Sequence, residues 1–341
     1  MLKVVYFHRK PHEGFFSVEN LFDTVRGALP PGIEPVVAES RFLSKGFFRR
    51  AYIIVEAKFR QGDVNHITGD VHFLSYLLCR RKTVLTILDC GFAEKERGVK
   101  RQLLRYFWYV LPIWRVAFIT VISKTVELEL KKLVTFPSGK VRVIPCCIPE
   151  TFSYSEKIFN AGKPRILQVG TRENKNLVRV ARALEGIPCH LDIVGKLTDE
   201  QKGMLSECGI EYSNSWGIPE TELIRKYQEC DLVLFVSTYE GFGLPILEGN
   251  AVGRPVITSN ISSMPEVAGD SACLVNPYDE ADVRSGILKV INESSYRQEL
   301  VAKGLVNVRR FRPEQIAMQY AELYKEVSDV QSVSRTGAYS G

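Results

Sequence analysis

Short apolar runs alternate with amphipathic helical patterns along the whole chain. This alternation is typical of repeated βα units, in which helices connect the strands of a parallel sheet. In the first half it predicts strands at Leu2–Phe7, Tyr52–Val55, Val64–His66, Thr83–Leu88, Phe118–Ile122 and Val141–Ile144. In the second half it predicts strands at Arg165–Val169, His190–Val194, Leu232–Val236, Pro255–Thr258 and Ala272–Leu274. The expected fold class is therefore α/β, with one parallel sheet in each half.

The segment between the two sets of strands has no clear period and contains three prolines between Pro145 and Pro164. We therefore expect a first domain over residues 1–150, a linker over 151–163 and a second domain over 164–312. The last periodic stretch has Pro313 in its first turn and apolar residues at helical spacing, which predicts a helix over 313–328 that covers another surface. Residues 329–341 lack periodicity and are expected to form a flexible tail.

Composition narrows the class of protein. The chain has 341 residues, 45 Lys and Arg against 39 Asp and Glu, and 45% hydrophobic residues, which excludes collagenous, disordered and disulfide-miniprotein classes. Residues 1–150 carry 24 basic and 14 acidic residues, a net charge of +10, whereas the remainder carries 21 and 25, a net charge of −4. Domains of opposite net charge are expected to have different partners.

Targeting signals are not apparent in the sequence. The apolar run at the start is too short for a signal peptide, and the stretch from Leu103 to Ile122 is interrupted by Arg105, Pro112 and Arg115, so we do not expect it to span a membrane. The eight cysteines include no CxxC pair, which suits neither a zinc site nor a disulfide framework. We expect a cytoplasmic protein.

The densest chemical signal is the segment 237–248, directly after the predicted strand at 232–236. Pro245 suits the first turn of a helix, and Gly253 can end that helix. Gly241 and Gly243 allow the backbone to approach a ligand, and the free amides at a helix start attract anions. The sequence therefore predicts a strand, a glycine loop and a short helix that together bind an anion, most naturally phosphate.

Two carboxylates, Glu240 and Glu248, flank this loop, although their spacing alone is a weak motif. The context is more specific: Glu-Gly-Phe-Gly-Leu-Pro-Ile-Leu-Glu at 240–248, Gly-Arg-Pro-Val-Ile-Thr at 253–258, Ser-Met-Pro-Glu-Val at 263–267 and Gly-Asp-Ser-Ala at 269–272. Together these stretches resemble the donor-binding signature of family 4 (group 1) retaining glycosyltransferases. The resemblance implies a GT-B fold, in which two Rossmann-like domains face each other across a cleft and the C-terminal helix crosses back to the first domain.

The resemblance also implies roles for individual residues. Glu248 would bind the ribose hydroxyls of a sugar nucleotide, and Glu240 would lie by the transferred sugar. The backbone around Gly241, Phe242, Gly243 and Leu244 would hold sugar hydroxyls and phosphate. The alternative is that Glu240 is a solvated loop carboxylate and Glu248 an exposed helix residue.

A second stretch, residues 168–177, resembles the other half of the same site. Gly170 ends a predicted strand and is followed by Thr171, Arg172 and Lys175, so the two cations are expected to clamp the diphosphate and stabilise it as it leaves. In the family the arginine usually follows the glycine directly, whereas Thr171 intervenes here. Ile218 lies where family members contact the base through backbone atoms, and a plain helix-entry turn is the alternative.

The first half contributes the expected acceptor side. Gly14 lies in a loop after the first strand, where a GT-B enzyme approaches the donor, and Ser17 follows it. The absence of G-x-G-x-x-G at this point argues against a dinucleotide-dependent oxidoreductase. His72 and Asp89 fall at later strand ends and are the remaining acceptor-side candidates, although family members often have His where Leu88 stands.

Cations alternate with large apolar residues at 41–50 and 95–108. Such segments suit the surface of an anionic membrane, here the inner face, and the alternative is a solvated basic helix over the core. Nucleic acid is not expected, because no binding motif accompanies the charge.

The function expected from these features is that of a retaining glycosyltransferase (EC 2.4) that moves a sugar from a nucleotide diphosphate sugar to a hydroxyl of a glycan or lipid-linked acceptor, in cell-surface polysaccharide or glycolipid synthesis. No cofactor and no metal are expected. Two alternatives remain open: a non-catalytic nucleotide-sugar-binding partner subunit, and a GT-B epimerase or phosphorylase. The sequence leaves open the sugar, base, linkage and acceptor.

Overall fold

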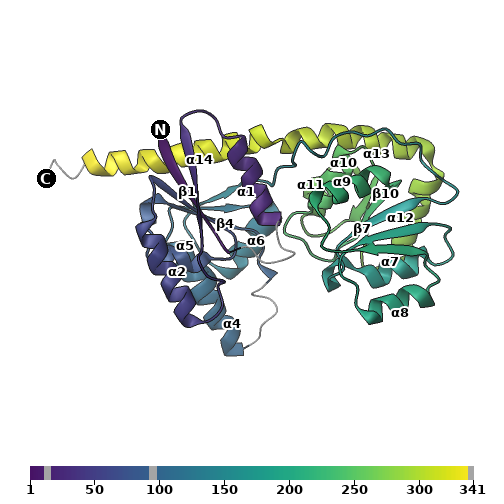
Figure 1. Ribbon diagram of the computed structural model, residues 1–341, viewed down its shortest axis with the longest axis horizontal. Helices are drawn as coiled ribbons and strands as arrows, with labels where there is room; N and C mark the ends of the chain where they lie inside the picture. Colours follow the sequence, from purple (N-terminus) through teal and green to yellow (C-terminus); the bar gives the residue numbers. More distant parts are fainter. Residues whose placement is uncertain (11–16, 92–97, 337–341) are drawn as a thin grey trace. The chain divides into compact units, whose positions relative to one another are not determined.

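The computed structural model describes residues 1–10, 17–91 and 98–336. The chain forms two compact units (Figure 1). The first contains Met1–Cys147 together with the residues from Pro313 onward, and the second contains Ile148–Arg312. Each unit is built on its own six-stranded sheet, and every strand pairing is parallel. The α/β class expected from the alternating pattern is confirmed.

The sheet of the first unit has the order β2-β1-β3-β4-β5-β6. Its strands are β1 (Leu2–His8), β2 (Ile33–Glu39), β3 (Val64–Thr68), β4 (Thr83–Ile87), β5 (Phe118–Val121) and β6 (Val141–Val143). The central strands β3 and β4 are buried along their whole length, as expected for parallel strands covered on both faces. The helices are α1 (Ser17–Gly27), α2 (Phe47–Phe59), α4 (Gly98–Arg105), α5 (Leu111–Trp114), α6 (Lys124–Leu133) and α14 (Pro313–Thr336), with short turns η1 (His72–Tyr76), η2 (Arg80–Lys82) and η3 (Tyr106–Val110).

The C-terminal helix α14 belongs to the first unit, as the GT-B expectation required, and lies beside α1 and β3. A buried polar network fixes it there. The Tyr324 hydroxyl lies 2.7 Å from His66 Nδ1 and donates to the Tyr6 hydroxyl at 3.0 Å, while His66 Nε2 lies 2.7 Å from Thr86 Oγ1. Burial lowers the pKa of His66 to about 3, so its ring is neutral and both of its nitrogens are satisfied.

Two sequence predictions in this unit are wrong, and one strand was missed. Residues 52–55, expected as a strand, lie inside α2. Strand β2 was not predicted; it contains Pro35, which is tolerated because β2 is the edge of the sheet. Helix α14 does not end at residue 328 but continues to Thr336, where a flexible tail was expected.

The sheet of the second unit has the order β12-β11-β10-β7-β8-β9. Its strands are β7 (Arg165–Val169), β8 (His190–Val194), β9 (Tyr212–Ser215), β10 (Leu232–Phe235), β11 (Val256–Ser259) and β12 (Ala272–Val275). Its helices are α7 (Leu177–Leu184), α8 (Asp199–Glu207), α9 (Glu220–Glu229), α10 (Leu244–Ala251), α11 (Met264–Ala268), α12 (Glu280–Asn292) and α13 (Ser294–Asn307), with turns η4 (Glu173–Lys175) and η5 (Val308–Phe311). All predicted strands are present, and the polar edge strand β9 is additional.

Candidate functional site

The strand order of the second unit changes direction between β7 and β10. From β7 the chain proceeds outward through β8 and β9, and from β10 it proceeds the other way through β11 and β12. In open parallel sheets, ligands bind beyond the carboxyl ends of the strands at such a switch point, because the loops there diverge. The two loops at this position are those that follow Val169 and Phe235, and both carry sequence-predicted site residues.

The loop after β10 leads into α10 as predicted. Gly243 precedes the helix with a φ of 117°, a conformation that favours glycine, and Pro245 lies in the first turn. The side chains of Ser262 and Ser263 donate to the Glu240 carbonyl at 2.8 and 2.9 Å, which fixes the loop from the side of β11. Pro245 has no N–H, and the Ile246 amide donates to the Gly243 carbonyl at 3.0 Å, so Leu244 is the residue of the first turn whose N–H is not needed within the helix.

Lys175 and Glu240, which lie far apart in the sequence, form an ion pair at the switch point. Lys175 Nζ donates to Glu240 Oε1 at 2.6 Å, and both side chains are largely buried. Asn174 Nδ2 donates to the Tyr239 carbonyl at 2.9 Å and to Glu240 Oε1 at 3.2 Å. Two donors from the β7 side therefore converge on one carboxylate from the β10 side.

Gly170 makes room for this lysine. Its φ is 97°, and a Cβ at this position would come within 2.8 Å of Lys175 Cε. The ammonium group also lies 4.6 Å from the centre of the Phe235 ring, at the end of β10. Glycine at 170 is thus required both by the backbone conformation and by the path of the lysine side chain.

Glu248 lies on α10 in a less polar environment. Its carboxylate accepts a hydrogen bond from the Tyr227 hydroxyl of α9, and Tyr227 is fully buried. Burial raises the pKa of Glu248 to about 7, even though the Tyr227 hydrogen bond and the positive charge of Lys175 act in the opposite direction. The carboxyl group is therefore held ready to ionise near neutral pH and lies within electrostatic range of Lys175.

The other donor-side candidates surround this centre. Thr171 is held by its neighbours, since its Oγ1 donates to the Lys196 carbonyl at 2.8 Å and its own carbonyl accepts from Gln201 Nε2 at 2.7 Å. Arg172 is exposed at the start of the turn that carries Lys175. Ile218 is half-buried between β9 and α9. The second unit therefore collects the donor-side candidates at the carboxyl ends of β7, β9 and β10.

The acceptor-side candidates belong to the first unit. His72 is buried, and its Nδ1 lies 2.8 Å from the Trp108 carbonyl, so part of its bonding capacity serves the fold. Asp89 is exposed after β4 and accepts from the Gly91 amide at 3.1 Å. Ser17 begins α1, and Gly14 lies outside the described residues. Their functional roles stay predictions.

Sequence reasoning missed three residues that position the carboxylates. Tyr227 and Asn174 donate to Glu248 and Glu240, and Ser263 fixes the Glu240 carbonyl. Asn174 stands beside Lys175 in a stretch already recognised as phosphate-binding, which is a usable signal. Tyr227 stands in an ordinary amphipathic helix and gives none.

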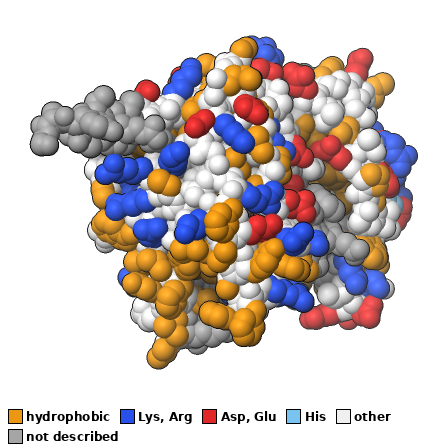
Figure 2. All heavy atoms as spheres, turned by 60° about the vertical axis from the view of Figure 1, so that its left-hand side comes forward, with side chains coloured by type: hydrophobic (Ala, Val, Ile, Leu, Met, Phe, Trp, Pro, Cys, Tyr) orange, Lys and Arg blue, Asp and Glu red, His pale blue; other side chains and the backbone are white. Residues whose placement is uncertain are grey.

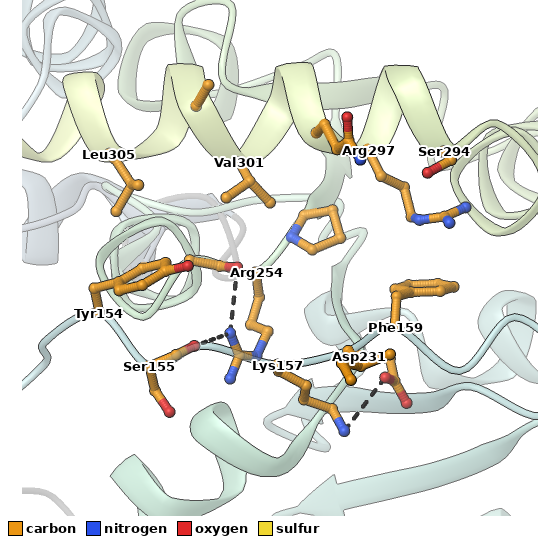
Figure 3. Close-up of a pocket in the computed structure, with 15 residues that line it drawn as sticks. Tyr154, Ser155, Lys157, Phe159, Asp231, Arg254, Ser294, Arg297, Val301 and Leu305 are labelled. Atoms are coloured by element: carbon orange, nitrogen blue, oxygen red, sulfur yellow. Dashed lines mark hydrogen bonds and ion pairs between the residues drawn. The ribbon is translucent and has the colours of Figure 1, made fainter.

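A cavity of about 520 Å³ lies elsewhere in the second unit (Figure 3). It adjoins Asp231 and Pro255, which precede β10 and β11, and is therefore at the amino edge of the sheet. Two of its cations already have structural partners: Arg254 donates to five backbone carbonyls including that of Ser155, and Lys157 Nζ lies 3.4 Å from Asp231 Oδ1. We therefore place the functional site at the opposite edge.

Two parallel α/β units in tandem, with the C-terminal helix returned to the first, define the GT-B fold. Among solved structures the chain resembles sucrose-phosphate synthase from Thermosynechococcus elongatus, with a TM-score of 0.78 at 17% identity over 97% of this chain and 100% of that one. It also resembles Anabaena Alr3699/HepE in complex with UDP and glucose, with a TM-score of 0.76 at 15% identity over 96% and 100%. At these identities the likeness shows the fold.

Residues 151–305 match the model of the family described as glycosyl transferases group 1. The matched stretch lies within the second unit, which is therefore similar to the group 1 glycosyltransferases. Curated relatives include O-antigen chain mannosyltransferase B of Escherichia coli, 36% identical over 32% of this chain and 28% of the relative. Serotype-specific mannosyltransferase WbdA of Escherichia coli is 28% identical over 67% and 32%. The chain thus spans about a third of the length of these relatives.

Proposed function

We propose that this chain is a glycosyltransferase that transfers a sugar from a nucleotide diphosphate sugar to a hydroxyl of a glycan or lipid-linked saccharide, in the synthesis of a cell-surface polysaccharide or glycolipid. The observation that carries the proposal is the Lys175–Glu240 pair at the switch point of a group 1 glycosyltransferase unit. The names of the mannosyltransferase relatives support a glycan product, and the UDP complex of Alr3699/HepE supports a nucleotide donor.

The chemistry we propose is a transfer that retains the configuration of the sugar. The bond between the anomeric carbon and the phosphate oxygen breaks, the acceptor oxygen forms a bond to the same carbon on the same face, and the acceptor proton passes to the departing phosphate oxygen. No separate base is then needed. Negative charge develops on the diphosphate, and Lys175, Arg172 and the amides before α10 are the groups available to stabilise it. The proposal invokes neither a metal ion nor a cofactor.

The two carboxylates have different roles in this scheme. Glu248 accepts hydroxyl groups of the ribose, so it contributes to donor binding. Glu240 faces the transferred sugar and pairs with Lys175 at 2.6 Å. A diphosphate that binds Lys175 competes with this carboxylate for the ammonium group. Glu240→Gln should therefore leave nucleotide affinity unchanged or raise it while it lowers turnover, whereas Glu248→Gln should weaken nucleotide binding.

The experiment combines a binding screen with a transfer assay. Wild type and both variants are titrated with GDP-mannose, UDP-glucose and the free nucleotides by calorimetry, and turnover is measured with a saccharide acceptor by mass spectrometry of the product. Glu280→Gln is a matched control, because that carboxylate is on the surface of the same unit and pairs with Arg182 at the amino end of α12. Its kinetics should equal those of wild type.

The outcomes separate the proposal from its alternatives. A new glycosidic bond, formed without phosphate as substrate or product, supports transfer over an epimerase or phosphorylase. Binding of a donor with neither hydrolysis nor transfer would favour the non-catalytic partner subunit. Unchanged donor binding in Glu248→Gln together with unchanged turnover in Glu240→Gln would refute the assignment of the site.

A further inference from the structure

Helix α2 of the first unit is apolar on two faces. One face packs inward through Ile53 and Ala57, which are buried. The other is open to solvent and carries large side chains spaced three or four residues apart: Phe48 (86% exposed), Tyr52 (44%), Val55 (48%) and Phe59 (80%). This spacing places all four on one side of the helix. A monomer in water gains nothing from such an arrangement, so the outer stripe points to a partner.

A second exposed stripe lies on α4 and the turn that follows it. Val99, Leu103, Tyr106 and Phe107 are all exposed and recur at helical spacing. Again the helix directs large apolar side chains toward solvent. The same unit therefore repeats one feature on two elements that are distant in the sequence.

The elements that carry the two stripes approach each other through Arg50 and Trp108. Arg50 of α2 lies over the ring of Trp108, with its guanidinium carbon 5.3 Å from the ring centre, and over Phe73 at 5.8 Å. Trp108 directly follows Phe107 of the second stripe. Figure 2 shows hydrophobic side chains gathered on the lower part of this face, with Lys and Arg side chains beside them. We call the surface formed by Phe47 and the two stripes the aromatic–basic face.

The charge around this face has one sign. Segments 41–60 and 98–110 contain nine basic residues and a single acidic one, Glu56. Glu56 lies 3.6 Å from Arg60, whereas Lys45, Arg49, Arg101 and Arg105 are exposed. Aromatic side chains interleaved with cations match an interface that is apolar inside and negatively charged outside. A second copy of the chain would bring like charges together on this face, which disfavours self-association.

We propose that the aromatic–basic face docks on the surface of an anionic lipid bilayer, with Phe47, Phe48 and Phe59 at the level of the headgroups and the cations on lipid phosphates. This is attachment to a membrane surface. Within the described ranges, no helix is both long and apolar enough to cross a membrane. The docking uses no residue of the donor site, so it can be tested whether or not the proposed transfer is correct.

The test is co-sedimentation of the full chain with vesicles of phosphatidylcholine alone and with 30 mol% phosphatidylglycerol. We expect binding to the anionic vesicles that weakens as salt rises. Each basic residue near the headgroups contributes about five-fold in affinity, so Arg49→Gln with Arg101→Gln should lower binding about 25-fold. Phe47→Ser with Phe48→Ser should remove most of it. Ile158→Ser with Arg225→Gln is the control, since both residues are exposed on the second unit.

All variants should retain the melting temperature of wild type, which shows that they fold. Equal binding to neutral and anionic vesicles, or equal loss in the control, would overturn the proposal. So would a dimer, detected by sedimentation, that Phe47→Ser with Phe48→Ser dissociates while vesicle binding persists. If the chain binds the nucleotide sugar but not anionic vesicles, the docking proposal is refuted and the donor site is not. If it binds anionic vesicles but no nucleotide sugar, the donor site is refuted and the docking proposal is not.

Discussion

Glu248 offers a quantitative test of the site, because its environment opposes its ionisation. Burial raises the pKa of this carboxyl from 4.5 to about 7 in the folded protein. One pKa unit corresponds to about 1.4 kcal/mol, so the ionised carboxylate is disfavoured in the folded state by about 3 kcal/mol. Glu248 is therefore expected to lower the free energy of unfolding at neutral and higher pH, as residues that serve ligand binding often do.

The sign of the pH dependence follows from the protons bound in each state. As pH rises, the unfolded chain loses the proton of Glu248 near 4.5 and the folded chain only near 7. Between these values the unfolded state holds fewer protons, so the free energy of unfolding falls with pH, and the loss is complete above 7. Glutamine does not titrate, and its amide oxygen can still accept from the Tyr227 hydroxyl. Relative to wild type, Glu248→Gln should therefore gain about 3 kcal/mol between pH 4.5 and pH 8.

Scanning calorimetry of the ligand-free chain at pH 5, 6, 7 and 8 measures this gain. For a unit of this size, 1 kcal/mol shifts the melting temperature by about 2–4 °C, so the variant should melt about 6–12 °C higher at pH 8 and only slightly higher at pH 5. The transition that nucleotide shifts in wild type identifies the second unit. Glu207→Gln, an exposed carboxylate on α8, should show no such trend. A pH-independent difference, or a less stable variant at pH 8, would refute the reasoning.

Further predictions concern side chains that hold the site and the units. Gly170→Ala should lower the turnover number strongly and the free energy of unfolding only slightly, because the new Cβ displaces the Lys175 side chain. Steady-state kinetics and urea denaturation of the same sample check this. Tyr324→Phe should destabilise the first unit by about 1–3 kcal/mol, because the bonds to His66 and Tyr6 are lost; urea denaturation measures it. Arg254→Ala should lower the free energy of unfolding of the second unit by at least about 3 kcal/mol, because buried carbonyls lose the hydrogen bonds that the guanidinium group donates. The dissociation constant of the nucleotide sugar should stay unchanged.

Whether a strand could be predicted from the sequence depended on how apolar its residues are. Strand β10 is apolar along its whole length and β4 and β7 carry mainly apolar residues, as expected where both faces of a parallel sheet are covered, and all three were predicted. Strand β3 is fully buried although it contains Asn65 and His66, and it was predicted as well. Strands β2 and β9 lie at sheet edges, where solvent permits polar residues and a proline. The other two edge strands, β6 and β12, keep a short apolar sequence and were predicted, so β2 and β9 were missed because their own residues are largely polar or interrupted by a proline.

Helix α2 was missed for a different reason. The run Tyr-Ile-Ile-Val at 52–55 contains β-branched residues on consecutive positions and thus has the appearance of a buried strand. In the structure it is a helix whose inner face is covered by the first unit and whose outer face is open. A helix that is apolar on both sides cannot be distinguished from a strand by its period alone. The exposed apolar face of α2 therefore led to a wrong prediction, and the same face is the one that suggests a membrane partner.

The candidate site was predictable one loop at a time, but not its internal pairing. Each motif indicated a ligand: Glu240 a sugar and Lys175 a diphosphate. The parallel topology sets the carboxyl ends of β7 and β10 side by side, so Lys175 and Glu240 form an ion pair. An isolated buried cation would be costly, and the Glu240 carboxylate offsets that cost. Under the proposed function, the net gain from a diphosphate is the difference between two ion pairs, because the diphosphate and Glu240 compete for Lys175.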